Sequence, residues 1–442
     1  MPTLSRPIRA ITPVLLSAVV LASCTNADTG TDTDTGATES SAASPASSST
    51  HDHGDDHDHG AGEQAQLTEV ASIVPRVVLA HDGGITVIDS ETGETVSETD
   101  LDGFLRLNNS GDGRHVMVTA GDRFLAFDAA VQSRAHGDHA HNYAGDPSLT
   151  DIAYDEPEAG HVVVNEGLTA LFSDGDGTAR IVPTDQVAAG YRPAEGVVVD
   201  SGAPHHGVAV PFADGSVLIT VGDEDNRQRI EYRDAEGKVQ AHTDDCPGIH
   251  GEAMAAEGAV VFGCQNGPVV FDGTDFRKVD PGTEYQRSGN LAGHADSPII
   301  LGDHKVDEDA ELERPTEIAL IDTRNATMRT VDLGSSYWFR SLGRGPAGEA
   351  VVLTYDGHLK VIDPESGEII RDIPAIAAWE EKDEWQEPGP VLRVVGDHAY
   401  VTDAENNELV VVDLTSGEEA ARHELPVTPV EMAVADGKPA AH

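Results

Sequence analysis

The chain has 442 residues, and 28 Lys and Arg residues stand against 78 Asp and Glu residues, which gives a formal net charge of −50. A surface this acidic repels the phosphates of nucleic acids and anionic lipid headgroups, so the composition argues against a nucleic-acid-binding protein. Hydrophobic residues make up 39% of the chain, which is enough to bury a core, and the 3 cysteines are too few for a disulfide scaffold.

The first residues have the pattern of an export signal. Arg6 and Arg9 form a short positive region, and the mostly apolar segment 11–22 is too short for a stable transmembrane helix. This segment runs into Ala22-Ser23-Cys24, which resembles a bacterial lipobox. We therefore expect residues 1–23 to be a lipoprotein signal peptide and Cys24 to be the lipidated N-terminus, the alternative being an ordinary signal peptide with an incidental cysteine. The mature protein is then extracytoplasmic and attached to the outer face of the cell membrane only by its lipid anchor.

Residues 24–70 are rich in Thr, Ser, Ala, Asp and Gly and have almost no large apolar side chains, so we expect a flexible tether. Within it, segment 51–60 alternates histidines with carboxylates. Imidazole binds Zn²⁺, Cu²⁺ and Ni²⁺, and nearby carboxylates concentrate cations. We predict that this tract captures metal with moderate affinity and fast exchange; the alternative is a solvated acidic linker. Its candidate auxiliary ligands are His51, His53, His57 and His59.

Residues 71–442 consist of short β-branched runs separated by turns, without long helical periodicity, which predicts an all-β domain. Many runs end in an Asp followed by a small turn with Gly, and such units recur about every 46 residues, near the period of a propeller blade. The clearest copies are at Asp89, Asp363 and Asp413, and the weaker ones are at Asp128, Asp174, Asp234, Asp272 and Asp322. We therefore predict a single β-propeller, with eight blades or alternatively seven, whose ring is closed by a strand from segment 429–434. A pair of β-sandwiches fits less well, because the repeat runs through the whole domain.

Several histidines fall in loops that open the predicted inner strands, all on one face of the propeller. His206 and His250 are each followed by Gly, which lets backbones approach closely. A zinc site needs three or four N, O or S ligands at tetrahedral positions, which neighbouring blades can supply. A lone histidine here is more often structural, and we interpret His161, among others, as an ordinary strand residue. The predicted metal ligands are His136, Asp138, His139, His141, His206, His250 and His294.

Cys246 and Cys264 are the cysteines that remain after the signal. In an exported protein the default is a disulfide, which would fix the loop that carries His250; the rival is a Cys/His metal site. The sequence shows no nucleophile elbow, P-loop or dinucleotide fingerprint, so we predict no catalytic residue.

Together these features resemble the AztD-type zinc metallochaperones. The resemblance covers residues from His51 to the C-terminus and depends on the His/Asp-rich tract, the segments 136–141 and 205–207, and segment 246–251. It implies an extracytoplasmic protein whose cargo is Zn²⁺ and whose partner is the solute-binding protein of a zinc ABC importer. The lipid anchor departs from a freely soluble chaperone.

Two other functions remain open from the sequence. One is a propeller metalloenzyme, either a copper-site reductase or a lactonase with an open metal position. The other is an interaction scaffold in which the histidine tract is incidental.

Overall fold

The β-branched runs form strands, and most of their side chains are buried. In β2 (Arg76–His81), for example, Val77, Val78 and Leu79 are all fully buried. A strand of an ordinary half-exposed sheet would bury alternate residues, so this run shows that both faces of the sheet are covered by neighbouring sheets. The computed structural model describes residues 65–189 and 197–440, which belong to one unit of the chain, His59–His442. The predicted signal peptide, Cys24, His51, His53, His57 and His59 lie outside the described residues.

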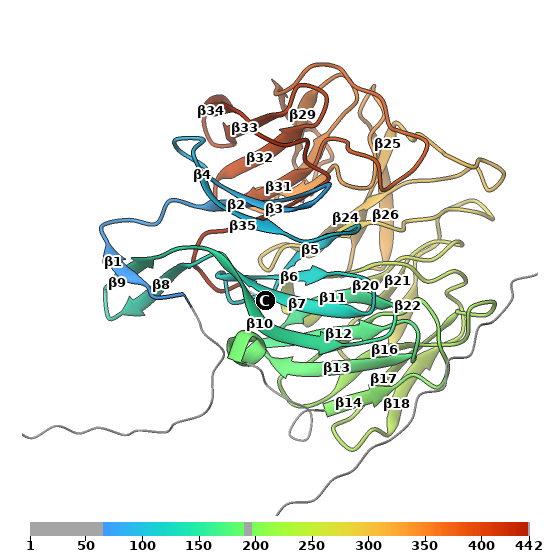
Figure 1. The fold of residues 1–442 in the computed structure, drawn as a ribbon. Helices are drawn as coiled ribbons and strands as arrows, with labels where there is room; N and C mark the ends of the chain where they lie inside the picture. Colours follow the sequence, from blue (N-terminus) through green and yellow to red (C-terminus); the bar gives the residue numbers. More distant parts are fainter. Residues whose placement is uncertain (1–64, 190–196, 441–442) are drawn as a thin grey trace, which may run out of the picture. The chain divides into compact units, whose positions relative to one another are not determined.

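The described residues form eight antiparallel sheets of four strands, which follow one another around the body (Figure 1). The first two in chain order are β35 (Glu431–Ala435), β2, β3 (Gly84–Asp89) and β4 (Thr95–Asp100), then β10 (Ser148–Asp155), β7 (Arg123–Asp128), β6 (His115–Thr119) and β5 (Arg106–Asn109). The next two are β11 (Ala159–Asn165), β12 (Leu168–Ser173), β13 (Thr178–Pro183) and β14 (Val197–Asp200), then β15 (Ala209–Pro211), β16 (Val217–Val221), β17 (Arg229–Arg233) and β18 (Val239–Thr243).

The remaining four sheets have the same meander. They are β19 (Glu252–Met254), β20 (Val260–Phe262), β21 (Val269–Phe271) and β22 (Phe276–Lys278), then β23 (Leu291–Ala292), β24 (Ile299–Asp303), β25 (Glu317–Asp322) and β26 (Thr327–Asp332). The last two are β27 (Leu342–Arg344), β28 (Ala350–Leu353), β29 (His358–Ile362) and β30 (Ile369–Pro374), then β31 (Leu392–Val395), β32 (His398–Asp403), β33 (Glu408–Asp413) and β34 (Glu418–Glu424). The arrangement confirms the predicted all-β propeller; eight such sheets are what the eight-blade prediction requires.

The C-terminal strand closes the ring, as predicted. β35 pairs antiparallel with β2 from Arg76↔Ala435 to Ala80↔Glu431, so the first and last strands of the domain share one sheet. In Figure 1 the blue strands β2–β4 accordingly lie next to the red strands β32–β34.

A smaller three-stranded sheet stands apart from these eight. It consists of β1 (Thr68–Val70), β9 (His139–Ala144) and β8 (Val131–His136), in that order. β1 lies at the C-terminal end of the range predicted for the tether. The helical residues in the described part are two short 3₁₀ turns, η1 (Thr184–Ala189) and η2 (Ala256–Gly258), and no helix there is long and apolar enough to cross a membrane.

Most of the predicted Asp turns form as expected. The Asp89 carboxylate accepts hydrogen bonds from the backbone N–H groups of Glu91 and Thr92, and Asp363 and Asp413 act in the same way. The copy assigned to Asp174 is wrong by one position, because Ser173 takes the turn site and its carbonyl accepts the N–H of Gly177. The Asp174 carboxylate is therefore free for another role.

Candidate metal centres

Three histidines from three successive sheets meet near the ends of inner strands. His161 lies near the start of β11, His206 just before β15 and His250 just before β19. Each offers one ligand nitrogen, and these nitrogens all lie within 4.8 Å of one another. We call this group the triad. His161 Nε2 and His206 Nε2 are 3.1 Å apart, which is too close for two charged imidazoles and suits a shared cation or proton.

The other ring nitrogen of each triad member has its own neighbour. His206 Nδ1 donates to the Asp174 carboxylate at 2.6 Å, and His250 Nδ1 donates to the Gly289 carbonyl at 2.7 Å. His161 Nδ1 lies 3.8 Å from a carboxylate oxygen of Glu252. Such contacts fix the tautomer and ring orientation, so that Nε2 of His206 and of His250 is left to bind a metal ion.

Two glycines allow this packing. A Cβ on Gly160 would lie 2.4 Å from an Asp174 carboxylate oxygen, so only glycine lets that carboxylate reach His206. Gly251 has φ +77°, and a Cβ there would lie 2.5 Å from the carbonyl oxygen of Gly289. The expectation that the Gly after His250 permits a close backbone approach is therefore confirmed.

A disulfide holds the loop that carries His250. Cys246 and Cys264 are bonded, as predicted, and both are fully buried. Two backbone hydrogen bonds support the same loop, from His250 N–H to the Gly263 carbonyl and from Gly263 N–H to the Gly251 carbonyl. His250 thus stands on a covalently closed, hydrogen-bonded loop and has little freedom to move away.

Burial keeps two of the triad histidines neutral. It lowers the pKa of His250 to about 4 and the pKa of His161 well below its ordinary value, and the neighbouring His206 adds to both effects. Neutral imidazole is the form that binds a metal ion, so these two ligands are ready at neutral pH. Burial also raises the pKa of Glu252 to about 8, so this carboxyl is protonated in the metal-free protein at pH 7.

An acidic pocket of about 540 Å³ leads to His206. Its charged lining residues are Glu158, Asp174, Glu224, Asp225 and Arg227. The excess of carboxylates raises the local concentration of cations beside the triad.

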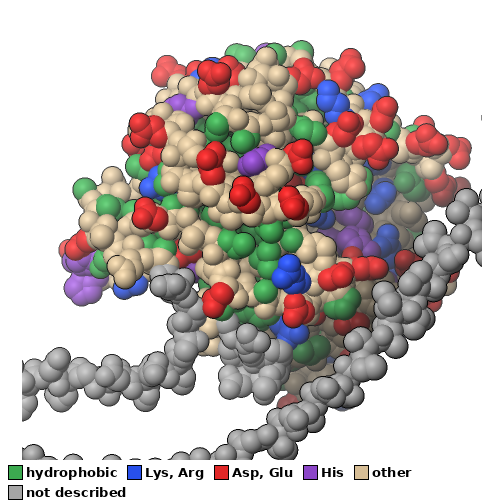
Figure 2. All heavy atoms as spheres, viewed as in Figure 1, with side chains coloured by type: hydrophobic (Ala, Val, Ile, Leu, Met, Phe, Trp, Pro, Cys, Tyr) green, Lys and Arg blue, Asp and Glu red, His purple; other side chains and the backbone are tan. Residues whose placement is uncertain are grey.

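A second group of histidines lies at the tip of the β8–β9 hairpin, and we call it the hairpin cluster. His139 Nε2 is 3.5 Å from His136 Nδ1 and 3.3 Å from His141 Nε2. His141 Nδ1 donates to Glu69 of β1 at 2.7 Å, and His139 Nδ1 donates to Asp138 at 3.2 Å. The side chains of His139 and His141 are 55% and 39% exposed, and Figure 2 shows histidine atoms gathered over this hairpin at the left edge of the molecule.

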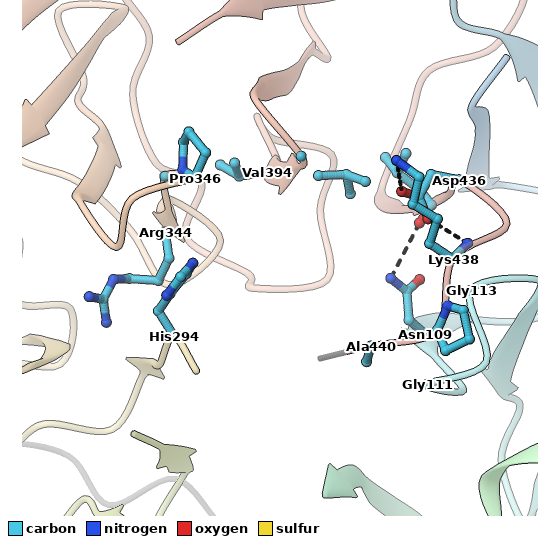
Figure 3. Close-up of a pocket in the computed structure, with 15 residues that line it drawn as sticks. Asn109, Gly111, Gly113, His294, Arg344, Pro346, Val394, Asp436, Lys438 and Ala440 are labelled. Atoms are coloured by element: carbon cyan, nitrogen blue, oxygen red, sulfur yellow. Dashed lines mark hydrogen bonds and ion pairs between the residues drawn. The ribbon is translucent and has the colours of Figure 1, made fainter. Parts of the chain in front are cut away.

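The structure divides the predicted ligands into two groups. His206 and His250 belong to the triad, whereas His136, His139 and His141 form the hairpin cluster, with Asp138 hydrogen-bonded to it. His294 joins neither group. It lines a different pocket of about 460 Å³, where it lies beside Arg344 and across from Asp436 and Lys438 (Figure 3).

Sequence reasoning missed His161, which lies within an ordinary strand pattern. The available signal was its place at the start of an inner strand, the same criterion that pointed to His206 and His250. His205, the neighbour of His206, is structural: it is 1% exposed, and its ring nitrogens bond to the Ala203 carbonyl and to Thr220 Oγ1.

With this geometry established, the chain can be compared with known proteins. No protein-family model matches it. The zinc chaperone AztD of Citrobacter koseri is 26% identical over 344 residues, which is 75% of this chain and 79% of that protein. This chain resembles AztD. The resemblance expected from the sequence motifs is thereby confirmed.

Solved structures agree in fold. The crystal structure of C. koseri AztD has a TM-score of 0.70 at 24% identity and matches 84% of this chain and 100% of its own. The structure of apo AztD from the same organism has a TM-score of 0.69 at 23% identity and matches 83% of this chain and 98% of its own. The dihydro-heme d1 dehydrogenase NirN shares the fold more distantly, with a TM-score of 0.53 at 14% identity, over 85% of this chain and 77% of its own.

Proposed function

We propose that this chain is an extracytoplasmic zinc metallochaperone that acquires Zn²⁺ and passes it to the solute-binding protein of a zinc ABC importer. The observation that carries the proposal is the triad, in which three imidazoles converge and two of them are oriented by hydrogen bonds through Nδ1. Three protein ligands with an open fourth position are typical of zinc sites that exchange a ligand. The resemblance to the zinc chaperone AztD supports zinc as the cargo.

The two histidine groups suit successive steps of such a function. The hairpin cluster is exposed and can take up or release a metal ion rapidly, whereas the triad is half-buried, oriented and fit to retain it. Release then proceeds by ligand exchange, in which an incoming partner ligand takes the open position before a histidine leaves. No bond is made or broken in a substrate, so we propose no catalytic residue.

We propose the same compartment and organisation as the sequence indicates. The buried disulfide favours an oxidising compartment. Residues 1–23 act as a lipoprotein signal peptide, residues 24–70 as a lipidated tether with the histidine tract and residues 71–442 as the propeller. Incorporation of radiolabelled palmitate that is lost in Cys24→Ser tests the anchor.

Competition with a chromophoric zinc chelator tests the function. The mature protein should hold one Zn²⁺ tightly, and removal of segment 25–66 should lower the stoichiometry without removing this site. The zinc-loaded protein should then transfer its metal to the solute-binding protein faster than free dissociation permits. Absence of any tight site in either form would refute the proposal, and turnover of lactones by the metal-loaded protein would favour an enzyme instead.

A further inference from the structure

Two arginines near the triad form no close ion pair, although the charge of Asp174 acts on Arg227 and the charge of Arg287 acts on Asp303. Arg227 donates only to the backbone carbonyl of His206, at 3.3 Å, and the Nε of Arg287 is buried without a hydrogen-bond partner. Among the described residues, neither forms an ion pair with a carboxylate. Arginines elsewhere in this chain do, as in the buried pair of Arg340 and Glu431. In a protein with 78 acidic residues, two neighbouring unpaired guanidinium groups are unexpected.

Both guanidinium charges act on the triad, because burial chiefly, and with it the charges of His206, Arg287 and Arg227, lowers the pKa of His250. A point at the Cβ position of Gly289 is 3.3 Å from Arg287 Nε and 3.5 Å from His250 Nδ1, so this guanidinium stands beside the ring of His250. Arg227 lines the acidic pocket together with His206. The two arginines interact electrostatically with each other, since burial and the charge of Arg287 lower the pKa of Arg227.

A divalent ion at the triad would have no negatively charged ligand in direct contact, although the pocket beside it is rich in carboxylates. Its three ligands are neutral imidazoles, and no carboxylate among the described residues belongs to the ligand group. Asp174 accepts a hydrogen bond from His206 Nδ1, and Glu252 lies near Nδ1 of His161, not near its Nε2. The two guanidinium groups therefore oppose a Zn²⁺ ion in this partly buried site, against the attraction of the pocket carboxylates, and an anion between the ion and the arginines would remove this repulsion.

We propose that metal binding at the triad is coupled to the binding of a carboxylate-bearing ligand, which Arg227 and Arg287 hold and whose oxygen fills the fourth metal position. Arginine matches carboxylate with a planar fork of donors, and a carboxylate oxygen is a regular zinc ligand. The carboxylate is supplied either by a small organic acid or by an acidic side chain of a peptide segment. This inference rests on the proposed function, because it assumes that the triad holds the metal.

Cobalt(II) provides the probe, because its visible absorption reports the ligands of the bound ion. The protein is the mature chain with His51, His53, His57, His59 and His139 changed to Ala, so that the triad gives the signal. In a perchlorate buffer without carboxylates, titration with acetate should change the spectrum and tighten cobalt binding about tenfold, which is roughly 1.4 kcal/mol.

The double variant Arg227→Gln/Arg287→Gln gives the decisive comparison. Without acetate the double variant should bind cobalt a fewfold more tightly than its parent, because the repulsion by the two arginines is gone. With acetate it should bind cobalt more weakly than its parent, because acetate no longer tightens its binding. Arg329→Gln, which removes a charge from exposed β26, is the matched control and should behave as the parent. Weakening of equal size in both buffers would show that the arginines are merely structural and would overturn the inference.

The source of the carboxylate is settled by a second titration with the peptide acetyl-Asp-Gly-Asp-amide. A response at much lower carboxylate concentration than for acetate assigns an acidic protein segment, and equal responses assign a small organic acid. A response to inorganic phosphate but to neither carboxylate probe would overturn the ligand class. If His206→Ala leaves cobalt binding unchanged, the proposed function itself fails, and this result is distinct from a triad that binds cobalt but ignores acetate.

Discussion

The triad and the hairpin cluster contain the same three side chains but differ in what surrounds them. Triad histidines come from three sheets, and their loops are held by a disulfide, by tight glycine contacts and by hydrogen bonds to Nδ1. Hairpin histidines come from one two-stranded ribbon and are exposed. The comparison teaches that proximity of three imidazoles does not by itself fix affinity or rate of release. Orientation and burial decide whether such a group retains a metal ion or exchanges it.

Loss of a triad ligand should produce the largest effect. In His206→Ala, two imidazoles remain, and we expect the tight zinc affinity to fall about a thousandfold, or roughly 4 kcal/mol. The matched variant His139→Ala should leave the tight site intact and remove only weaker binding. Chelator competition on both variants measures this difference, and equal losses would abolish the distinction between the two groups.

The carboxyl of Glu252 beside the triad is buried, whereas the carboxylate of Glu69 beside the hairpin cluster is exposed. Because the pKa of Glu252 is raised from 4.5 to about 8 in the folded metal-free protein, ionisation is opposed in the fold, and stability falls as pH rises between these values. Glu252→Gln should therefore be more stable than the parent at pH 8, by on the order of 3 kcal/mol, and nearly equal to it at pH 5.

Urea unfolding of the metal-free protein at several pH values tests this. Glu69→Gln, which changes a carboxylate beside the hairpin cluster, serves as the control and should show no such pH trend. A Glu252→Gln advantage that is the same at pH 5 and pH 8 would contradict the buried titration.

The carboxylate that orients His206 should have an intermediate effect. In Asp174→Asn the ring loses a charged acceptor for Nδ1–H, and zinc affinity should fall about 10- to 100-fold. Asp176→Asn changes an exposed carboxylate in the same turn and should have almost no effect. If both variants bind zinc alike, the hydrogen bond at 2.6 Å does not orient the ligand.

The smallest effect is expected at the hairpin. Glu69 accepts a hydrogen bond from His141, but the pair is exposed and screened by water, so Glu69→Gln should weaken binding at this cluster by at most about fivefold. Isothermal titration calorimetry with zinc, in a His206→Ala background, measures this change in the affinity of the hairpin cluster. A loss as large as that of Asp174→Asn at the triad would show that exposure matters less than we argue.

Much of the fold could be predicted from the sequence, because its signals are local. The runs at Val77 and Val351 alternate with Asp turns, and each turn is determined by a few neighbouring residues. The triad members His206 and His250 were also predicted as candidate ligands, since each is followed by Gly at the start of an inner strand. The disulfide between Cys246 and Cys264 was predicted from the expected export of the chain.

What escaped prediction depends on contacts between distant segments. His161 lies in a strand with no unusual neighbours and joins the triad only because β11 stands beside β15 and β19 brings His250 near. Asp174 was taken for a turn residue, since a shift of one position is invisible without the hydrogen bond of Gly177 to Ser173. The separation of the hairpin histidines from the triad also required three dimensions, because loop assignments alone placed them on one face.

The pairing of β2 with β35 has a consequence for folding of the chain during its synthesis. The strand that completes the first sheet is the last of the described strands in chain order, so Val77 and Leu79 lack their partners Val434 and Met432 until residues 431–435 have been synthesised. Until then the first sheet presents an apolar, unpaired edge, which is a template for aggregation. A chain cut short before residue 431 keeps that edge permanently, so the whole ring depends on complete synthesis of β35.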